Sequence, residues 1–298
     1  MSLRVTQGMM NAQFLRNISN NIEKMNNLQN QLSTGRKINK PSDDPVGITF
    51  SMRYRSELSA NDQFQRNVDS ALSNLDYVDT MLGQAGSVLQ RVRELAVKGA
   101  SATNPDTAME SIRIEVDEMY KQLVDIGNSK FNGKYVFNGQ LTNEKPYPDT
   151  GASGVDTDSG DLIYELGPGL KMPTNITGQE AFGASTDADN VFRLIEQLSA
   201  DLANNDHDAV SGAIDQIDAR MNKLLEARSE VGARVNRIEL VQGRLNDIGI
   251  NLENLQSKTE DADMTEVITK LKMGENVYQA ALSTGAKLIQ PSLVDFLR

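Results

Sequence analysis

Few side chains in this sequence could carry out catalysis, and its single histidine is the first to consider. His207 lies in an acidic stretch, Asn-Asn-Asp-His-Asp, and the chain contains no cysteine. A zinc site needs several His or Cys ligands, and a hydrolytic triad needs a histidine held beside a nucleophile. A lone histidine at a polar helix start meets neither requirement. We therefore expect no zinc centre and no triad.

Carboxylates are the second group with possible chemistry. Asp43 and Asp44 are adjacent and could be compared with the paired acids of a glycosidase. Their place before Pro45 is better explained by loop polarity and by capping of a following helix. The clusters Asp156–Asp158 and Glu260–Asp263 lack EF-hand spacing, so we interpret both as surface. No glycine-rich phosphate loop follows a strand pattern. The sequence thus predicts a protein that is not an enzyme and has no cofactor or metal.

Composition restricts the partners. The net charge of −11 and the pI of about 4.7 argue against nucleic acid, because phosphate binding needs clustered Lys and Arg. No run of about 18 apolar residues predicts a membrane span, and the first residues lack the apolar region of a secretory signal peptide. A hydrophobic fraction of 39% with no Trp favours long helices with narrow seams over an enzyme core.

The segment Leu32–Pro45 organises the rest of the chain as a joint between two helices. Gly35 can end the first helix, because glycine adopts the left-handed conformation of a helix end at little cost. Pro45 suits the first position of the next helix, and the carboxylate of Asp44 before it can cap that helix. The candidate joint residues are Gly35, Arg36, Lys37, Asp43, Asp44 and Pro45.

The helix before the joint and the last helix of the chain carry similar apolar seams, at steps of three or four residues. The first seam consists of Val5, Met9, Ala12, Leu15, Ile18, Ile22, Met25, Leu28 and Leu32. The last helix has a cap at Asp263, after a second break at Lys258–Ala262, and its seam consists of Met264, Val267, Leu271, Gly274, Tyr278, Ala281, Gly285 and Leu288. We expect the two terminal helices to pair and their seams to form an assembly interface, as in a polymerising protein.

Between the two breaks, heptad patterns predict four further helices. They cover about residues 45–100, 104–127, 188–202 and 207–257. The glycine- and proline-rich region between them contains two short strand patterns, Tyr135–Phe137 and Leu162–Leu166. The first lies between predicted turns at Asn132–Gly133 and Asn138–Gly139. It is predicted to be a small β-rich insertion, and a disordered loop is the alternative.

The predicted fold is therefore mainly α. It is an elongated antiparallel helical rod, or coiled-coil bundle, with paired terminal helices and a small β-rich insertion. Three domains are expected. Residues 1–40 and 263–298 form a terminal-helix assembly domain, residues 41–132 and 188–262 form a helical rod domain, and residues 133–187 form the insertion, expected to lie on the outside.

Several segments together resemble proteins of the flagellin type, over roughly two thirds of the chain. They are Leu3–Met10, Gln31–Ile38, Pro41–Pro45, Leu89–Ala96, Val231–Glu239 and the carboxyl-terminal helix ending Val294–Leu297. Within that family, Pro-Ser-Asp-Asp-Pro at 41–45, the Met9–Met10 pair and the modest length resemble the members at the junction between hook and filament.

The resemblance implies a structural subunit of the extracellular bacterial flagellum, secreted through the flagellar type III export apparatus. The implied partners are other copies of the chain, the other hook–filament junction protein, flagellin, and an export chaperone at the carboxyl-terminal helix. It also implies polar contacts between subunits at Arg36, Lys37, Asp43 and Asp44 of the joint, for which a solvated loop is the alternative. A filament flagellin is the alternative. A more remote alternative is a glycan-binding adhesin or enzyme in which the insertion carries the activity, but no sequence motif supports it.

One further segment matches the part of flagellin that an innate immune receptor reads. The residues concerned are Gln90, Arg91, Arg93, Glu94 and Leu95. The other interpretation is structural, because Val92 belongs to a helical seam and the charged residues can face a neighbouring helix.

Overall fold

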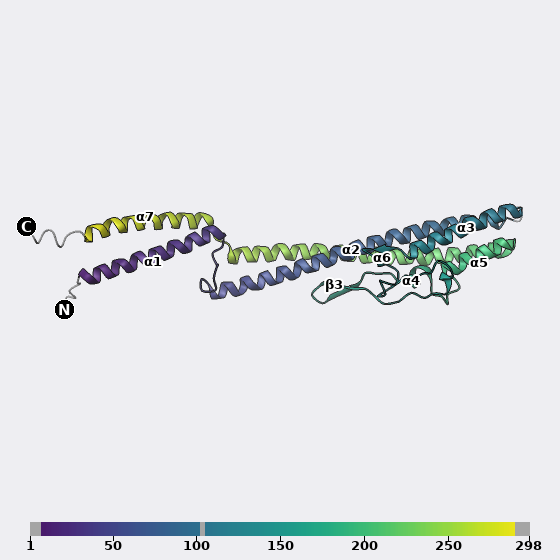
Figure 1. Cartoon of the computed structure of the whole chain (residues 1–298), viewed down its shortest axis with the longest axis horizontal. Coiled ribbons are helices and arrows are strands. Elements are labelled where there is room, and N and C mark those ends of the chain that lie inside the picture. The colour runs from purple at the N-terminus through teal and green to yellow at the C-terminus, as the bar shows by residue number, and fades with distance from the viewer. Residues whose placement is uncertain (1–6, 102–104, 290–298) are drawn as a thin grey trace, which may run out of the picture. The chain divides into compact units, whose positions relative to one another are not determined.

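The computed structural model describes residues 7–101 and 105–289, which fold mainly as α-helix (Figure 1). The helices are α1 (Gln7–Thr34), α2 (Pro45–Gly99), α3 (Asp106–Gly127), α4 (Gly178–Phe182), α5 (Val191–Ala203), α6 (His207–Glu260) and α7 (Met264–Ile289). The strands are β1 (Lys130–Phe131), β2 (Lys134–Tyr135), β3 (Ile163–Gly167) and β4 (Leu170–Pro173), with a 3₁₀ turn at Ala152–Gly154. The prediction of a mainly α fold with a small β-rich insertion is confirmed.

The chain forms two compact units. The first comprises Met1–Ala60 and Ile248–Arg298, and the second comprises Asn61–Asp247. The boundary between them falls within α2 and α6. The predicted assembly domain, residues 1–40 and 263–298, belongs to the first unit. That it forms a domain of its own, and the division into three domains, stay predictions.

Local capping explains where the helices beside the two breaks begin and end. Gly35 has φ of 71°, and its N–H donates to the carbonyl of Gln31 at 2.8 Å, which closes α1. The Asp44 carboxylate accepts the N–H of Val46 at 3.1 Å and so caps α2. Asp263 accepts two N–H groups of the first turn of α7, at 2.9 and 3.1 Å. These three caps were predicted and are confirmed.

Several predicted boundaries are displaced by a few residues. Helix α6 continues to Glu260, so the second break is shorter than Lys258–Ala262. Helix α5 begins at Val191 rather than 188, because the Asn190 side chain accepts the first free N–H groups. Pro105 lies at the N-cap of α3 without a side-chain bond, and Asn104 lies outside the described residues.

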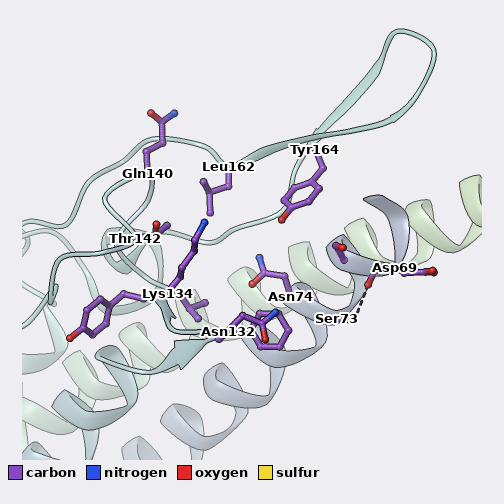
Figure 2. Close-up of a pocket in the computed structure, with 13 residues that line it drawn as sticks. Asp69, Ser73, Asn74, Asn132, Lys134, Gln140, Thr142, Leu162 and Tyr164 are labelled. Carbon is purple, nitrogen blue, oxygen red and sulfur yellow. Dashed lines mark hydrogen bonds between the residues drawn. The ribbon is translucent and has the colours of Figure 1, made fainter. Parts of the chain in front are cut away.

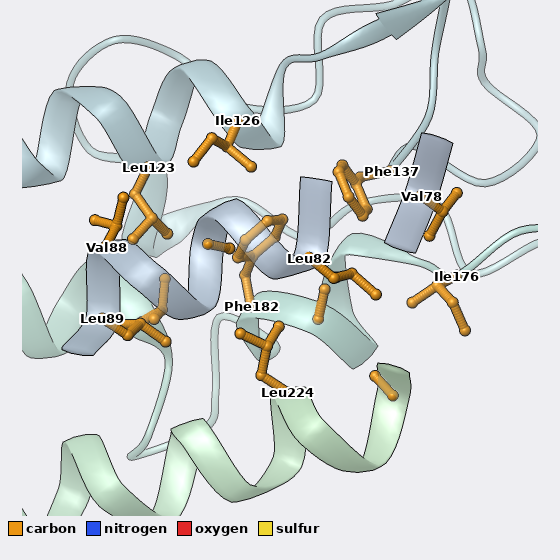
Figure 3. Packing of buried hydrophobic residues seen from close by; sticks show 14 of the residues in the cluster. Val78, Leu82, Val88, Leu89, Leu123, Ile126, Phe137, Ile176, Phe182 and Leu224 are labelled. Atoms are coloured by element: carbon orange, nitrogen blue, oxygen red, sulfur yellow. The ribbon is translucent and has the colours of Figure 1, made fainter. Parts of the chain in front are cut away.

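The core of the second unit runs along α2, α3, α5 and α6, and Figure 3 shows a part of it where the insertion meets the helices. Leu82 and Leu89 of α2, Leu123 of α3 and Leu224 of α6 are each at most 2% exposed. Side chains of the insertion complete this core, among them Phe137, Tyr147, Ile176 and Phe182. The insertion is therefore folded onto the helices through its aromatic residues.

Each sheet of the insertion is a two-stranded antiparallel hairpin. Strands β1 and β2 pair Lys130 with Tyr135 around a turn at Asn132–Gly133, whose φ angles of 50° and 80° are those of a type I′ turn. Of the predicted strand Tyr135–Phe137, only Tyr135 lies in β2, which begins one residue earlier than predicted. Val136 and Phe137 follow the strand and are buried. Strands β3 and β4 pair as the second hairpin. Strand β3 begins one residue later than the predicted strand Leu162–Leu166, and β4 was not predicted.

Candidate functional site at the interhelical joint

In the first unit, the linker between α1 and α2 pairs with the linker between α6 and α7. Arg36 and Asp261 form an antiparallel β-bridge. On either side of it, the N–H of Lys37 donates to the carbonyl of Glu260 at 2.7 Å, and the N–H of Ala262 donates to the carbonyl of Gly35 at 2.9 Å. The two predicted breaks are thus one structural feature, held by main-chain hydrogen bonds.

The side chain of Glu260 is the centre of this joint. It is 1% exposed and accepts hydrogen bonds from Arg55 Nε at 2.8 Å, from Arg55 Nη2 at 2.5 Å, and from the Ser51 hydroxyl. Arg36 Nε lies 3.5 Å from the same carboxylate. We call Arg36, Ser51, Arg55 and Glu260 the joint clamp. It ties the end of α6 to the start of α2 and to the linker that follows α1.

Burial by itself would raise the pKa of Glu260. The hydrogen bonds from Arg55 and Ser51 outweigh burial, and the pKa lies below its ordinary value of 4.5. The same hydrogen bond raises the pKa of Arg55. The interpretation of Glu260 as a surface residue is therefore wrong, because partners on another helix compensate for its burial.

The rest of the α1–α2 linker is ordered by its own polar groups. The Asp43 carboxylate accepts the N–H groups of Asn39 at 3.0 Å and Lys40 at 2.8 Å, and these bonds lower the pKa of Asp43. The Lys37 ammonium donates to the carbonyl of Lys258 at 3.1 Å. The linker therefore presents a defined surface, which includes a polar hollow of about 360 Å³ lined by Asn27, Asn30, Gln31, Lys37, Asn39, Lys40, Ser42 and Asp43.

The joint clamp predicts a pH-dependent stability of the first unit. Because folding lowers the pKa of Glu260, its contribution to the free energy of unfolding is complete above about pH 4.5 and is lost as the pH falls through the lowered value. We expect the wild type to melt at a higher temperature than Glu260→Gln at pH 7 and the difference to shrink on acidification. Circular dichroism melts from pH 7 to pH 3 measure this, and a difference that stays constant with pH would contradict it.

Helices α1 and α7 lie side by side (Figure 1). The Asn21 side-chain amide donates to the carbonyl of Gly274 at 3.2 Å, and a Cβ at Gly274 would lie 3.1 Å from Met25. A Cβ at Gly285 would overlap the ring of Phe14. Small residues thus allow a close helix pair. The predicted seam residues that are buried or half-buried are Ile18, Met25, Leu28 and Leu32 of α1 with Val267, Leu271, Gly274, Tyr278, Ala281 and Gly285 of α7.

Other predicted seam residues lie outside the contact between α1 and α7. Met9 is 58% exposed, Leu15 64%, Ile22 40% and Met264 39%, and Ala12 is also exposed. Val5 lies outside the described residues, and so does the side chain of Leu288. The assembly role of the two seams stays a prediction.

The receptor-like segment of α2 is largely engaged within the second unit. Arg91 pairs with Glu94 at 2.9 Å and with Glu115 of α3 at 2.5 Å, and Arg93 pairs with Asp218 of α6 at 2.5 Å. Leu95 is 1% exposed and belongs to the core. A receptor approaching this fold would reach Gln90 and Glu94 but not Leu95.

A groove of about 630 Å³ lies between α2 and the insertion in the second unit (Figure 2). Its lining mixes apolar rings with hydroxyl, amide and charged groups, among them Asp69, Asn74, Phe131, Lys134 and Tyr164.

Among the described residues no cluster of three or more His, Asp or Glu side chains could hold a metal ion. Over those same stretches no helix is long and apolar enough to cross a membrane.

Comparisons with known proteins agree with this fold. Residues 5–142 match the family model of the bacterial flagellin N-terminal helical region, and residues 214–297 match that of the bacterial flagellin C-terminal helical region. The flagellin of Halalkalibacterium halodurans is 26% identical over 267 residues, which are 89% of this chain and 88% of that protein.

Two further relatives carry the name of a hook-associated protein. The flagellar hook-associated protein 3 of Salmonella typhimurium is 23% identical over 304 residues, covering 95% of this chain and 96% of that protein. The structure of the flagellar hook associated protein-3 of Legionella pneumophila aligns with a TM-score of 0.62 at 16% identity, over 70% of this chain and 98% of that one, and shares the fold. With both of its helical ends matched, the chain belongs to the flagellin family of bacterial flagellar structural proteins.

Proposed function

We propose that this chain is a structural subunit of the junction between hook and filament in a bacterial flagellum. The observation that carries the proposal is its match, over 95% of its length, to a flagellar hook-associated protein 3. Similarity of fold to a second protein of that name supports it. Flagellins match over a comparable share of the chain, so a filament flagellin is the competing function.

The first unit supports assembly through the terminal helices. After α1 and α7 pair, several large apolar side chains remain exposed on both: Met9, Leu15, Ile22, Ile268, Met273, Val277 and Leu282. Burying such a side chain completely contributes a favourable free energy of about 1.5–3 kcal/mol. Copies of the chain packed around these faces would cover them, which favours a polymer over an isolated subunit.

The other partners follow from the same proposal. In a ring the chain would contact further copies, the other hook–filament junction protein and flagellin, with the polar linker surface around Lys40 and Asp43 at subunit contacts. Before export through the flagellar type III apparatus, a chaperone would hold the carboxyl-terminal helix. The mature position is then outside the cell.

A deletion strain tests the proposal. Without a junction subunit, cells should retain hooks, lack filaments and release flagellin monomers into the medium. Electron microscopy of hooks and an immunoblot of the medium measure this, and a plasmid copy of the gene should restore filaments. Normal filaments in the deletion strain would overturn the junction assignment. Complete loss of flagellin from both cells and medium would favour the filament flagellin.

Truncation tests the assembly role of the termini. We expect removal of residues 1–32 or 264–298 to leave the second unit folded and monomeric, because its core at Leu82 and Leu123 involves neither segment. Circular dichroism should show cooperative melting, and sedimentation should show no polymers. A truncated chain that still polymerises would contradict the prediction.

A further inference from the structure

The chain contains two copies of the tripeptide Phe-Asn-Gly, only six residues apart. Phe131-Asn132-Gly133 forms the tip of the β1–β2 hairpin, and Phe137-Asn138-Gly139 follows the hairpin. No other asparagine in the sequence precedes a glycine. Asparagine before glycine is chemically labile, because no side chain on the glycine obstructs attack of its nitrogen on the asparagine carboxamide. With identical neighbours, the two asparagines can differ in reactivity only through the fold and the residue that follows glycine.

The fold restrains Asn138 through every polar atom of its side chain. It is 6% exposed, its Nδ2 donates to the carbonyls of Leu141 and Glu144, both at 3.1 Å, and its Oδ1 accepts the N–H of Asp158 at 3.1 Å. Ring closure at Asn138 would require these hydrogen bonds to break together inside a buried site, which is costly. This asparagine is therefore protected.

The fold leaves Asn132 without such restraints. Its side chain is exposed and, within the described residues, makes no hydrogen bond. The hairpin that carries it has a short ladder of two residue pairs, Lys130 with Tyr135 and Phe131 with Lys134, and beyond it the N–H of Val136 donates to the carbonyl of Ser129 at 3.2 Å. A ladder this short opens readily, and opening lets the backbone at Asn132 leave its left-handed conformation and bring the Gly133 nitrogen to the carboxamide carbon.

We infer that Asn132 is a site of spontaneous covalent modification. The Gly133 nitrogen forms a bond to Asn132 Cγ, the bond from Cγ to Nδ2 breaks, and Nδ2 leaves as ammonia with the proton of the Gly133 amide. Water then opens the resulting five-membered imide at one of its two carbonyls. The products are aspartate and isoaspartate, and water is the only co-reactant.

The modification changes the charge of the groove beside the hairpin. Figure 2 shows Asn132 and Lys134 at the groove, to which both contribute lining. Either product adds a carboxylate there. Isoaspartate also adds a methylene to the main chain, which a type I′ turn cannot accommodate without rearrangement. If the chain is an extracellular subunit, which rests on the proposed function, the modified fraction would rise with the age of the structure.

The experiment follows the purified full chain in mildly alkaline buffer at 37 °C over several weeks. Peptide mass spectrometry quantifies amide-to-acid conversion at both asparagines, and enzymatic methylation detects isoaspartate. We expect conversion at Asn132 to be at least about tenfold faster than at Asn138. Asn132→Gln should remove the fast phase and leave Asn138 unchanged.

A denatured sample supplies the matched control. In denaturant the two sites should convert at similar rates, because both are then the same tripeptide in a disordered chain. Similar rates at the two sites of the native chain, or faster conversion at Asn138, would overturn the inference. Conversion of both sites in denaturant would show that either outcome is due to the native fold and not to unreactive peptides. None of these outcomes depends on flagellar assembly, so the test is independent of the proposed function.

Discussion

Glu260→Ala is expected to release the joint clamp and to lower the free energy of unfolding of the first unit by about 2–3 kcal/mol. The carboxylate is 1% exposed and binds Arg55 through two nitrogens. Its removal leaves Arg55 and Ser51 without their acceptor. The Arg36 and Arg55 side chains are 46% and 44% exposed, so both can turn to water, which keeps the loss below that of a fully buried pair.

Hydrogen exchange measures this result where it should be greatest. The amides of Lys37 and Ala262, which bridge the two linkers, should lose protection in Glu260→Ala. Glu253→Ala, at an exposed position of the same helix, is the matched control and should leave both amides protected. Equal effects of the two substitutions would show that Glu260 has no special role in the joint.

Gly285→Ala is expected to separate α1 from α7, at a cost of about 1–3 kcal/mol. The added methyl group would overlap the ring of Phe14, and the glycine itself is buried between the helices. Alanine otherwise favours helix over glycine by about 1 kcal/mol, so a net loss of stability can come only from the packing. Thermal melting of the first unit, followed by circular dichroism, measures the change.

Two variants separate packing from helix propensity. Gly8→Ala adds the same methyl group to α1, where nothing lies within 4 Å, and should be neutral or stabilising. Phe14→Ala combined with Gly285→Ala removes the overlap and should be less unstable than the sum of the two single changes. Strict additivity would mean that Phe14 and Gly285 do not meet in solution.

The features that the sequence predicts best are those decided by neighbouring residues. The caps at Gly35, Asp44 and Asp263 depend on residues within four positions of the groups that they satisfy, and all three are as predicted. The two-residue turn at Asn132–Gly133 is equally local. The heptad seam of α2 through Leu75, Leu82 and Leu89 is long enough that its buried face is unambiguous.

The seam of α1 shows where periodicity is insufficient. Between Met9 and Ile18 the predicted seam advances by three residues each time, and each such step falls roughly 60° short of a full turn. The apolar stripe therefore winds around the helix, and a straight partner covers only part of it. Phe14 and Asn21 lie on the covered face instead, and neither was predicted. The steps of three after Met9 are the signal that could have found them.

The joint clamp was missed for a different reason. Glu260 lies in an acidic cluster, which is usually solvated, and its partner Arg55 is 205 residues away in sequence. No local pattern decides whether such a carboxylate is buried. The available hint was Ser51 and Arg55, two hydrogen-bond donors on one face of α2 at a spacing of four residues.

The bridge between Arg36 and Asp261, like other contacts of the first unit, joins residues near the two ends of the chain. Asn21 finds its partner Gly274 at a sequence separation of 253 residues, and Ser51 finds Glu260 at 209. Neither contact can form until residues near the carboxyl end of the chain are present. A chain that emerges from its amino end would complete the second unit first. Helix α1 would then wait for the last forty or so residues, so the first unit should be the final part of the molecule to fold.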